Sequence, residues 1–402
     1  MRVTISGAGG FIGGHLVKDF AARPGCNKIN ALFHKAAGET ASDAIKRQIQ
    51  KTELLERIPV ELHEKLNFID CDITNPYDME ELFKELEAKT EKKTETKTEQ
   101  PITKKPNNVF IHAAAKLISP KSDDSDACKK FLEINEAQVL ANAIANYQLA
   151  NELHCVFLSS VYVFNTTGPD PIDETTVLAC PPPTLYVKSK QAAEKYWVSR
   201  VKDIDFLYVP QVCGSHQHTE AILPVIANLL LFGGDTRDLK GGINPIHINN
   251  LTKIIYCVAS FRADHHALEP RRFCIAGDGD EPLDFQTLAI ALQNAAKKYN
   301  PNPFPAFKII EGIKNTIRID DKKLREFYLA GNLGDNMHTP IPYETTAQEL
   351  MESVWRRGNA IKIANANLSG VTRSLRLSQT PTEIQSAMPL LLTRSRSPSL
   401  KL

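Results

Sequence analysis

The most suggestive side chains for chemistry are a tyrosine and a lysine four residues apart, Tyr186 and Lys190. In a helix this spacing places both side chains on one face. A neighbouring ammonium group stabilises phenolate, which predicts a lowered pKa for Tyr186 and a usable proton donor or acceptor near neutral pH. The pattern is common by chance. It gains weight here because it follows a strand-like run, 155–158, that ends in Ser159-Ser160.

A glycine-rich turn at the amino terminus suggests a second kind of site. It comprises Gly7, Gly10, Phe11, Ile12 and Gly13, with the glycines spaced G-x-x-G-x-x-G. A β-branched run, 2–6, precedes the turn and a helix-compatible segment, 15–20, follows it. Glycines let a phosphate approach the backbone, and the N–H groups of the following helix attract an anion. The pattern predicts a dinucleotide pyrophosphate site.

The end of the second strand, 28–33, bears on the type of dinucleotide. An acidic residue at this position binds the ribose 2′-hydroxyl of NAD. Here the strand ends in Phe33, followed by His34 and Lys35, so the acid is missing and two potentially cationic groups are present. This favours NADP, with NAD as the alternative. His34 and Lys35 could also be solvated loop residues without a ligand.

Alternating strand-like and helix-like segments predict the architecture. The expected strands are 2–6, 28–33, 66–70, 108–112, 155–158, 206–209 and 273–276. Helices are expected within 40–66, from residue 79, and over 131–151, 186–201 and 221–232. This order predicts a doubly wound α/β fold with a parallel sheet and a site at the carboxyl ends of its strands.

The predicted organisation has a nucleotide-binding core in two pieces and a smaller C-terminal substrate-binding part. The core is expected over 1–210 and 246–277, and the substrate-binding part over 211–245 and 278–357. Residues 87–105, built from Lys, Glu and Thr, are expected to form a solvated surface insertion, either helical or disordered.

Composition limits the class of protein. A chain of 402 residues with 42% hydrophobic residues can bury a sizeable core. Its formal net charge of +1 gives no reason to expect a nucleic acid partner. The eight cysteines are scattered without a C-x-x-C pair, which is typical of reduced thiols in a cytoplasmic protein. The longest apolar run, 221–232, is too short to span a bilayer, and the amino terminus does not read as a signal peptide.

Six motifs together resemble a known family. In chain order they are Gly7/Gly10/Gly13, Asp72-Ile73, His112-Ala113-Ala114-Ala115, Asn135, Ser160 and Tyr186/Lys190. This order is similar to that of the extended short-chain dehydrogenases/reductases, which are NAD(P)-dependent epimerases, dehydratases and reductases. The resemblance covers about residues 1–355.

The resemblance implies a role for each motif. Tyr186 would be the catalytic acid/base, and Lys190 would hold the cofactor ribose and tune Tyr186. Ser160 would position the substrate oxygen, and Asn135 would support a proton relay. Ser160 is preferred over Ser159 because it occupies the second position of the family's S-[ST]-x-x-V-[YF] pattern.

Further positions would contact the cofactor. Asp72 and Ile73 would flank the adenine. The small side chains of Ala113 and Ala114 would let the dinucleotide lie against the backbone. His112 itself is more typical of a satisfied core histidine than of a catalytic one. No metal site is expected.

The implied activity is hydride transfer between a nicotinamide and a carbonyl or secondary alcohol of a small substrate. A nucleotide-sugar epimerase is the alternative, but the Arg that such members carry before the strand containing His247 is absent. The positions after Ser160 are Val161 and Tyr162, where sugar dehydratases carry an Asp-Glu pair, so no elimination of water is expected. A NADP(H)-sensing regulatory scaffold is the alternative of another class.

The remaining expectations concern the oligomeric state and the C-terminal segment. Family members often form homodimers, but nothing in this sequence tests that state. Residues 358–402 form a basic tail that is expected to be disordered. The tail could contact an acidic partner or membrane surface, accept phosphate, or have no role.

Overall fold

The computed structural model describes most of the chain. The described residues are 1–34, 41–91, 108–117, 119–120, 124–165, 170–217, 222–233, 237–240, 242–264, 270–278, 283–303, 307–310, 318–330 and 341–358. Lys35, most of the predicted insertion and nearly all of the tail therefore lie outside the described residues. The contacts divide the chain into two units, Met1–Val354 and Trp355–Leu402. All elements named below lie in the first unit.

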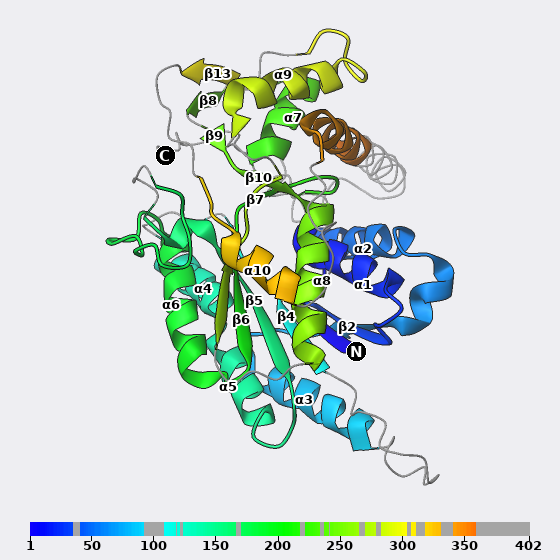
Figure 1. Cartoon of the computed structure of the whole chain (residues 1–402). Coiled ribbons are helices and arrows are strands. Elements are labelled where there is room, and N and C mark those ends of the chain that lie inside the picture. Colours follow the sequence, from blue (N-terminus) through cyan, green and yellow to red (C-terminus); the bar gives the residue numbers. More distant parts are fainter. Residues whose placement is uncertain are drawn as a thin grey trace, which may run out of the picture. The chain divides into compact units, whose positions relative to one another are not determined.

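A seven-stranded parallel sheet forms the centre of this unit (Figure 1), with the order β11-β6-β5-β4-β1-β2-β3. Its strands are β1 (Arg2–Ser6), β2 (Lys28–Phe33), β3 (Leu66–Asp70), β4 (Asn108–His112), β5 (His154–Ser160), β6 (Ile204–Val209) and β11 (Arg271–Cys274). The predicted doubly wound α/β fold is confirmed. The first four strands have the predicted bounds, and the other three begin one or two residues earlier than predicted.

The strand order determines where a site can form. β1 pairs with β2 on one side and with β4 on the other, so the chain reverses its direction of winding beside β1. In open parallel sheets a crevice forms at such a switch point, outside the carboxyl ends of the strands. The pairing of Ser6 with His112, and of Ser160 with Val209, brings several of these ends to one edge.

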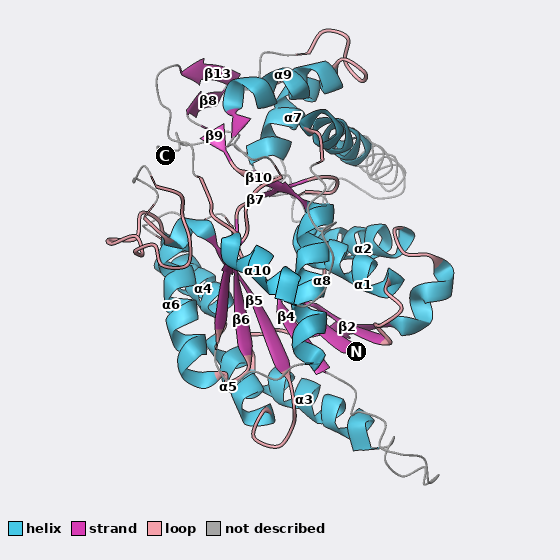
Figure 2. Cartoon of the chain, viewed as in Figure 1, coloured by secondary structure: helices cyan, strands magenta, loops and turns pink. Residues whose placement is uncertain are grey.

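Helices cover both faces of the sheet, as Figure 2 shows. The helices of one face are α1 (Phe11–Ala22), α8 (Ile248–Asp264) and α10 (Lys322–Ala330), and those of the other are α3 (Pro76–Glu91), α5 (Gln138–Tyr147) and α6 (Leu185–Arg200). α2 (Ala41–Glu56) and a 3₁₀ turn, η1 (Val60–Lys65), connect β2 to β3, and a second turn, η2 (Val161–Val163), follows β5. Each face buries its own hydrophobic cluster.

The single helix predicted over 131–151 is wrong, because two helices occupy this stretch. α4 (Ser125–Glu136) ends at Ala137, whose φ of 47° is left-handed, and α5 begins directly after it. The Trp197 indole N–H donates to the Glu136 carbonyl at 3.0 Å. A side chain from α6 thus satisfies a carbonyl that the helix break leaves without its intrahelical partner.

Short elements after β6 pair with one another. They are β7 (Gln211–Cys213), α7 (Ile222–Phe232), β8 (Arg237–Lys240), β9 (Gly242–Ile243), β10 (Pro245–His247), β12 (Leu283–Asp284), α9 (Phe285–Ala296) and β13 (Phe307–Ile310). β9 pairs with β12 and β8 with β13, which links 211–245 to 278–357. Residues 343–354, at the end of this unit, are also helical.

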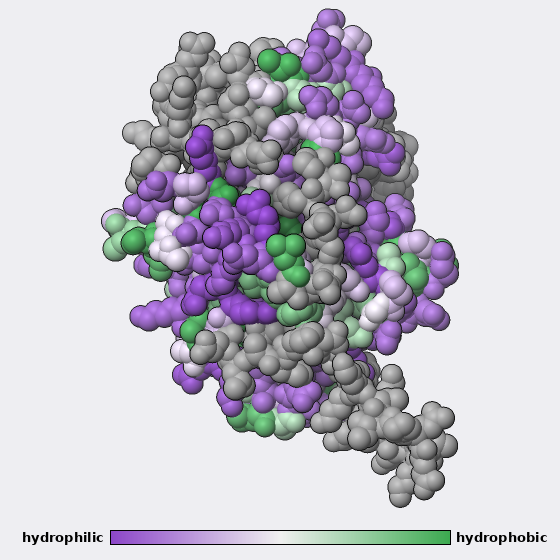
Figure 3. All heavy atoms as spheres, in the orientation of Figure 1, coloured by the Kyte–Doolittle hydropathy of each residue, from purple (hydrophilic) through white to green (hydrophobic). Residues whose placement is uncertain are grey.

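The visible surface of the described residues is mostly hydrophilic, with a few separate hydrophobic side chains (Figure 3). Within the described ranges, no helix combines the length and the apolar character needed to cross a bilayer.

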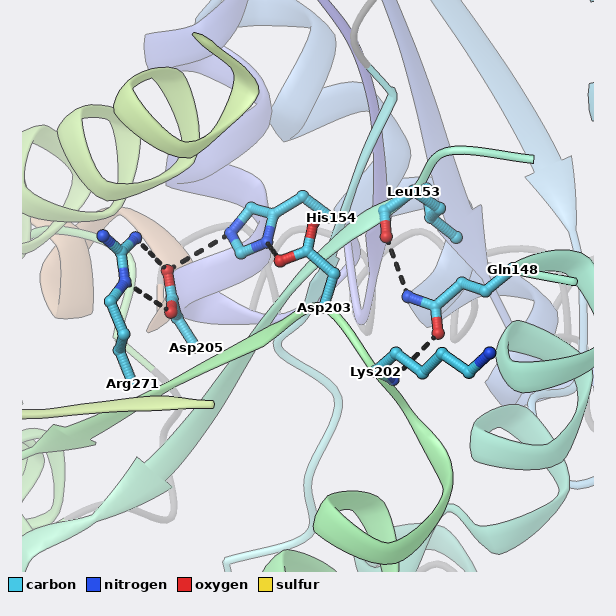
Figure 4. A network of polar contacts seen from close by, with 7 residues as sticks. All are labelled: Gln148, Leu153, His154, Lys202, Asp203, Asp205 and Arg271. Carbon is cyan, nitrogen blue, oxygen red and sulfur yellow. Dashed lines mark hydrogen bonds and ion pairs between the residues drawn. The ribbon is translucent and has the colours of Figure 1, made fainter. Parts of the chain in front are cut away.

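Charged side chains meet at the amino ends of β5, β6 and β11 (Figure 4), and two of them, His154 and Asp205, are buried. His154 contacts Asp203 through Nδ1 at 3.1 Å and Asp205 through Nε2 at 3.4 Å. Arg271 donates to both carboxylate oxygens of Asp205, at 3.0 and 2.7 Å. Burial acts to raise the pKa of Asp205, but hydrogen bonds with His154 and Arg271 outweigh it and lower that pKa to about 2.

The shifted pKa values in this network should make the free energy of unfolding depend on pH. Burial acts to lower the pKa of His154, but hydrogen bonds with Asp203 and Asp205 outweigh it and raise that pKa above 6.5. The stabilisation from His154 is full below pH 6.5 and is lost as pH rises through its folded pKa. The stabilisation from Asp205 is present above pH 3.8 and is lost as pH falls towards 2.

We expect Arg271→Met to lower the free energy of unfolding by about 3 kcal/mol, because it leaves a fully buried carboxylate with one cation fewer. Denaturant unfolding between the two pKa values measures this. Lys84→Met is the control, because Lys84 pairs with Glu80 and Glu81 on the surface, and we expect no measurable change. Equal stability of Arg271→Met and the unaltered chain would contradict the stabilising role of the Arg271–Asp205 ion pair.

Candidate active site

A cavity of about 680 Å³ opens where the carboxyl ends of the strands meet. Its lining includes the residues Gly7, Gly10, Phe11, Ile12, Phe33, His34, Arg47, Asp72, Ile73, Ala113, Ala114, Ser159, Ser160, Tyr162, Tyr186 and Lys190. Sequence segments more than 180 residues apart therefore meet around one cavity.

The glycine turn lets backbone segments approach each other more closely than side chains would allow. Gly7 has a φ of +73°, and a Cβ there would lie 2.7 Å from the Ala114 Cα. A Cβ on Gly13 would lie 2.6 Å from the backbone carbon of Gly7. The Gly10 N–H donates to the Gly7 carbonyl at 2.9 Å, which closes the turn at the start of α1. The backbone thus leaves room for an anion at a helix N-terminus, and these residues fit a dinucleotide pyrophosphate.

One end of the cavity holds the residues expected to contact the adenosine. The Asp72 carboxylate accepts from the Thr74 backbone N–H at 2.9 Å and from its hydroxyl at 2.7 Å. His34 Nδ1 lies 3.6 Å from the other Asp72 oxygen. Ile73 is nearly buried beside them. The three side chains therefore form one wall of the cavity at the ends of β2 and β3.

The opposite end holds Ser160, Tyr186 and Lys190. β5 carries Ser160 at its last position, and α6 carries the other two side chains one turn apart. Thr184 caps α6 by accepting a hydrogen bond from the Val187 N–H at 3.2 Å, so the helix begins just before Tyr186. The Lys190 ammonium, which is 2% exposed, donates to the Leu158 carbonyl at 3.0 Å. Burial lowers the pKa of Lys190 to about 8.

The predicted direction of the Tyr186 pKa is wrong in this structure. Burial raises the pKa of Tyr186 to about 12, although a hydrogen bond with Ser160 acts to lower it. The reason is that desolvation disfavours the phenolate, while the Lys190 ammonium is directed to a backbone carbonyl. In this structure the Tyr186 phenol therefore keeps its proton across the neutral pH range.

The structure places Asn135 behind the cavity wall and not in the lining. Its side-chain oxygen accepts from the Lys116 N–H at 2.7 Å, and its amide donates to the Lys116 carbonyl at 3.0 Å and to Ser189 Oγ at 3.2 Å. Asn135 thereby ties the segment after β4 to α6, next to Tyr186.

His112 lies in the core below the cavity. Its Nδ1 lies 2.8 Å from the Ser6 hydroxyl, and its ring stacks on Trp197 with centroids 5.3 Å apart. Burial, with a smaller effect of Lys190, keeps its pKa well below 6.5, so the ring is neutral. His112 therefore has a packing role and helps to hold β4 beside β1.

Comparisons with known proteins agree with this geometry. The family model NAD_binding_4, described as male sterility protein, matches residues 5–90, which contain the glycine turn and the Asp72-Ile73 pair. No curated protein matches the sequence. A Thermus thermophilus UDP-glucose 4-epimerase, solved in complex with NAD, is similar in structure with a TM-score of 0.61 at 17% identity, covering 88% of this chain and 99% of that one.

Two further solved structures give the same result. The UDP-glucuronic acid 4-epimerase of Bacillus cereus has a TM-score of 0.62 at 14% identity, over 89% of this chain and 99% of that one. The dTDP-glucose 4,6-dehydratase of Bacillus anthracis has a TM-score of 0.60 at 15% identity, over 89% and 97%. The chain therefore has the same doubly wound α/β fold as these enzymes. At these identities the similarity establishes the fold, not the reaction.

Arg47 is a charged cavity-lining residue that was not predicted from the sequence. Arg47, on α2, lines the cavity with His34, and its Nη1 lies 3.5 Å from Asp70 Oδ2. The signal available was a basic residue in the helix between β2 and β3. That signal is weak, because the same stretch contains other lysines and arginines.

Cys71 is among the residues that line the cavity. All eight cysteines are free, and burial raises the pKa of Cys71, which lines the cavity, to about 12. Among the described residues, no group of three or more His, Cys, Asp or Glu side chains could hold a metal ion.

Proposed function

We propose that this protein is a NADP(H)-dependent oxidoreductase that reduces a carbonyl group of a small substrate to a secondary alcohol. The observation that carries the proposal is that Ser160, Tyr186 and Lys190 line one cavity with the glycine turn. A bound nicotinamide supplies the hydride in this chemistry. The chain's own residues supply the proton and the orientation.

The proposed roles follow from the protonation states. Tyr186, with its pKa raised to about 12, keeps its proton at neutral pH and can donate it to the substrate oxygen. The Ser160 hydroxyl, hydrogen-bonded to Tyr186, orients that oxygen. Lys190 is partly protonated near its pKa of about 8, and its burial beside the cavity suits it to hold a cofactor ribose. A protonated Tyr186 is the form from which reduction of a carbonyl would start.

We propose reduction rather than epimerisation because this chain lacks an Arg that would bind a diphosphate. Nucleotide-sugar members of the resembled family often carry an Arg-Asp pair before the strand that corresponds to β10, where the Arg would contact the diphosphate. This chain has Gly241-Gly242-Ile243-Asn244-Pro245-Ile246 there. The solved relatives bind their own substrates, and their low identity does not carry those substrates to this chain. Loss of NADPH absorbance with a carbonyl panel tests the proposal. Sugar-nucleotide conversion without net cofactor change would favour the epimerase.

The proposed preference for NADP gives a prediction. Phe33 replaces the acid that would bind a ribose 2′-hydroxyl, while His34 and Arg47 line that end of the cavity. We expect NADPH to bind more tightly than NADH. Replacing Arg47 by Ala, or His34 and Lys35 together by Ala, should remove much of a preference of about 1–3 kcal/mol.

Titration of both cofactors by fluorescence measures this preference. Lys51→Ala is the matched control, because Lys51 lies one turn beyond Arg47 on α2 and contacts the Phe68 ring. We expect it to leave the preference unchanged. Tighter binding of NADH than NADPH would contradict the proposal.

A further inference from the structure

Two lysines line the cavity wall formed by α4 and the segment after β4. They are Lys116, four residues beyond the end of β4, and Lys130, in the middle of α4. Both side chains are exposed to solvent at the cavity. Among the described cavity-lining residues the only acidic side chain is Asp72, which is beside His34 at the other end.

The hydrogen bonds of Asn135 place this wall at the catalytic end of the cavity. Asn135 bonds both backbone groups of Lys116 and also reaches Ser189 Oγ at 3.2 Å. The Ser189 hydroxyl in turn donates to the Tyr186 carbonyl at 2.7 Å. Lys116 is therefore connected through two side chains to the first turn of α6, which carries Tyr186.

Helix geometry places Lys130 on the same wall. Lys130 and Ile134 are four residues apart on α4 and both line the cavity, so one face of the helix is turned to it. The neighbouring Lys129 points elsewhere, since it lies 4.0 Å from Glu133 and does not line the cavity.

The remaining cavity-lining cations have partners on the protein. His34 lies beside Asp72, Arg47 beside Asp70, and Lys190 bonds the Leu158 carbonyl. For the ammonium groups of Lys116 and Lys130, no carboxylate lies within ion-pair distance in the described part of the chain. This leaves an excess of positive charge at the end of the cavity where the substrate would bind, which attracts an anion.

We propose that Lys116 and Lys130 bind a compact anionic group of the substrate, a carboxylate or a phosphate, so that the substrate is an anionic carbonyl compound. This rests on the proposed reductase function. Lysine ammonium groups suit a compact anion, because each is a point charge with three freely oriented donors. Leu117, 55% exposed beside Lys116, would contact the carbon chain next to that anion.

Binding of inorganic phosphate and of acetate to the NADPH-saturated protein tests the anion site without turnover. NADPH occupies the cofactor's own phosphate positions, so calorimetry then reports on other positions. We expect Lys116→Gln with Lys130→Gln to weaken binding of at least one anion by about 10-fold or more. Lys129→Gln removes one charge from the same helix and should leave it unchanged. Equal affinity in the double variant and the unaltered chain would overturn the proposal.

Turnover of matched substrate pairs then separates the two kinds of anion. Dihydroxyacetone phosphate is compared with dihydroxyacetone, and pyruvate with acetone, using kcat/KM. We expect the anionic member of one pair to be preferred, and the double variant to lose that preference. A double variant that instead loses NADPH affinity and keeps anion binding would overturn the proposal. Lysine-dependent anion binding without reduction of any carbonyl would uphold the anion site and contradict the proposed reaction.

Discussion

Tyr186→Phe should lower kcat by about 100- to 10,000-fold, the range for loss of a positioned general acid. The substitution removes only a hydroxyl that lies in the cavity and is hydrogen-bonded to Ser160. Affinity for NADPH should stay within a few-fold, because the glycine turn and Lys190 are unchanged. Steady-state kinetics and a cofactor titration on the same preparation measure both quantities.

Tyr162→Phe is the matched control for this prediction. Tyr162 also lines the cavity, and burial raises its pKa, so the variant removes a second phenolic hydroxyl from the same hollow. Its backbone N–H donates to Ser160 Oγ at 3.3 Å, a contact that the substitution keeps. We expect at most a small loss of rate. Equal losses in the two variants would mean that Tyr186 is not the specific acid.

Gly13→Ala should both destabilise the fold and weaken cofactor binding. The added Cβ would meet the Gly7 backbone, which cannot move without opening the turn against Ala114. Overpacking of this kind costs about 1–3 kcal/mol. We expect a loss in the free energy of unfolding of about that size and at least a 10-fold loss of NADPH affinity, since the displaced turn is the proposed pyrophosphate site.

Gly14→Ala provides the contrast. A Cβ there would lie 3.4 Å from the Ala8 carbonyl oxygen and 3.5 Å from Leu54 Cδ1, which leaves room for it. Alanine is also the better helix former by about 1 kcal/mol. We expect unaltered or slightly increased stability. Equal results for Gly13→Ala and Gly14→Ala in unfolding and in cofactor titration would contradict the close contact between Gly13 and the Gly7 backbone.

The sheet could be predicted because its strands are apolar runs bounded by glycine turns and polar segments. The errors have one physical origin at β5, β6 and β11. These strands begin at or just before His154, Asp205 and Arg271, which read as loop residues in the sequence. In the fold these charges neutralise one another inside the sheet, and such a pairing of distant residues leaves no local pattern.

Many of the predicted site residues line one cavity, but Asn135 does not, and the direction of the Tyr186 pKa was predicted wrongly. Spacing placed Tyr186 and Lys190 on one face of a helix, and the structure brings Ser160 to the same cavity. Spacing does not report burial, so the direction of the Tyr186 pKa was wrong. Arg47 was missed because its approach to His34 depends on how α2 packs, not on its position in the chain.

Transfer of deuterium from NADPH that carries deuterium at both positions of the nicotinamide C4 tests the central claim most directly. With a carbonyl substrate from the panel, the account predicts one deuterium on the former carbonyl carbon for each NADPH consumed, detected by mass spectrometry. Tyr186→Phe should give almost no labelled alcohol while still binding the labelled cofactor. An alcohol product without deuterium, or labelling at the unaltered rate in Tyr186→Phe, would contradict the account.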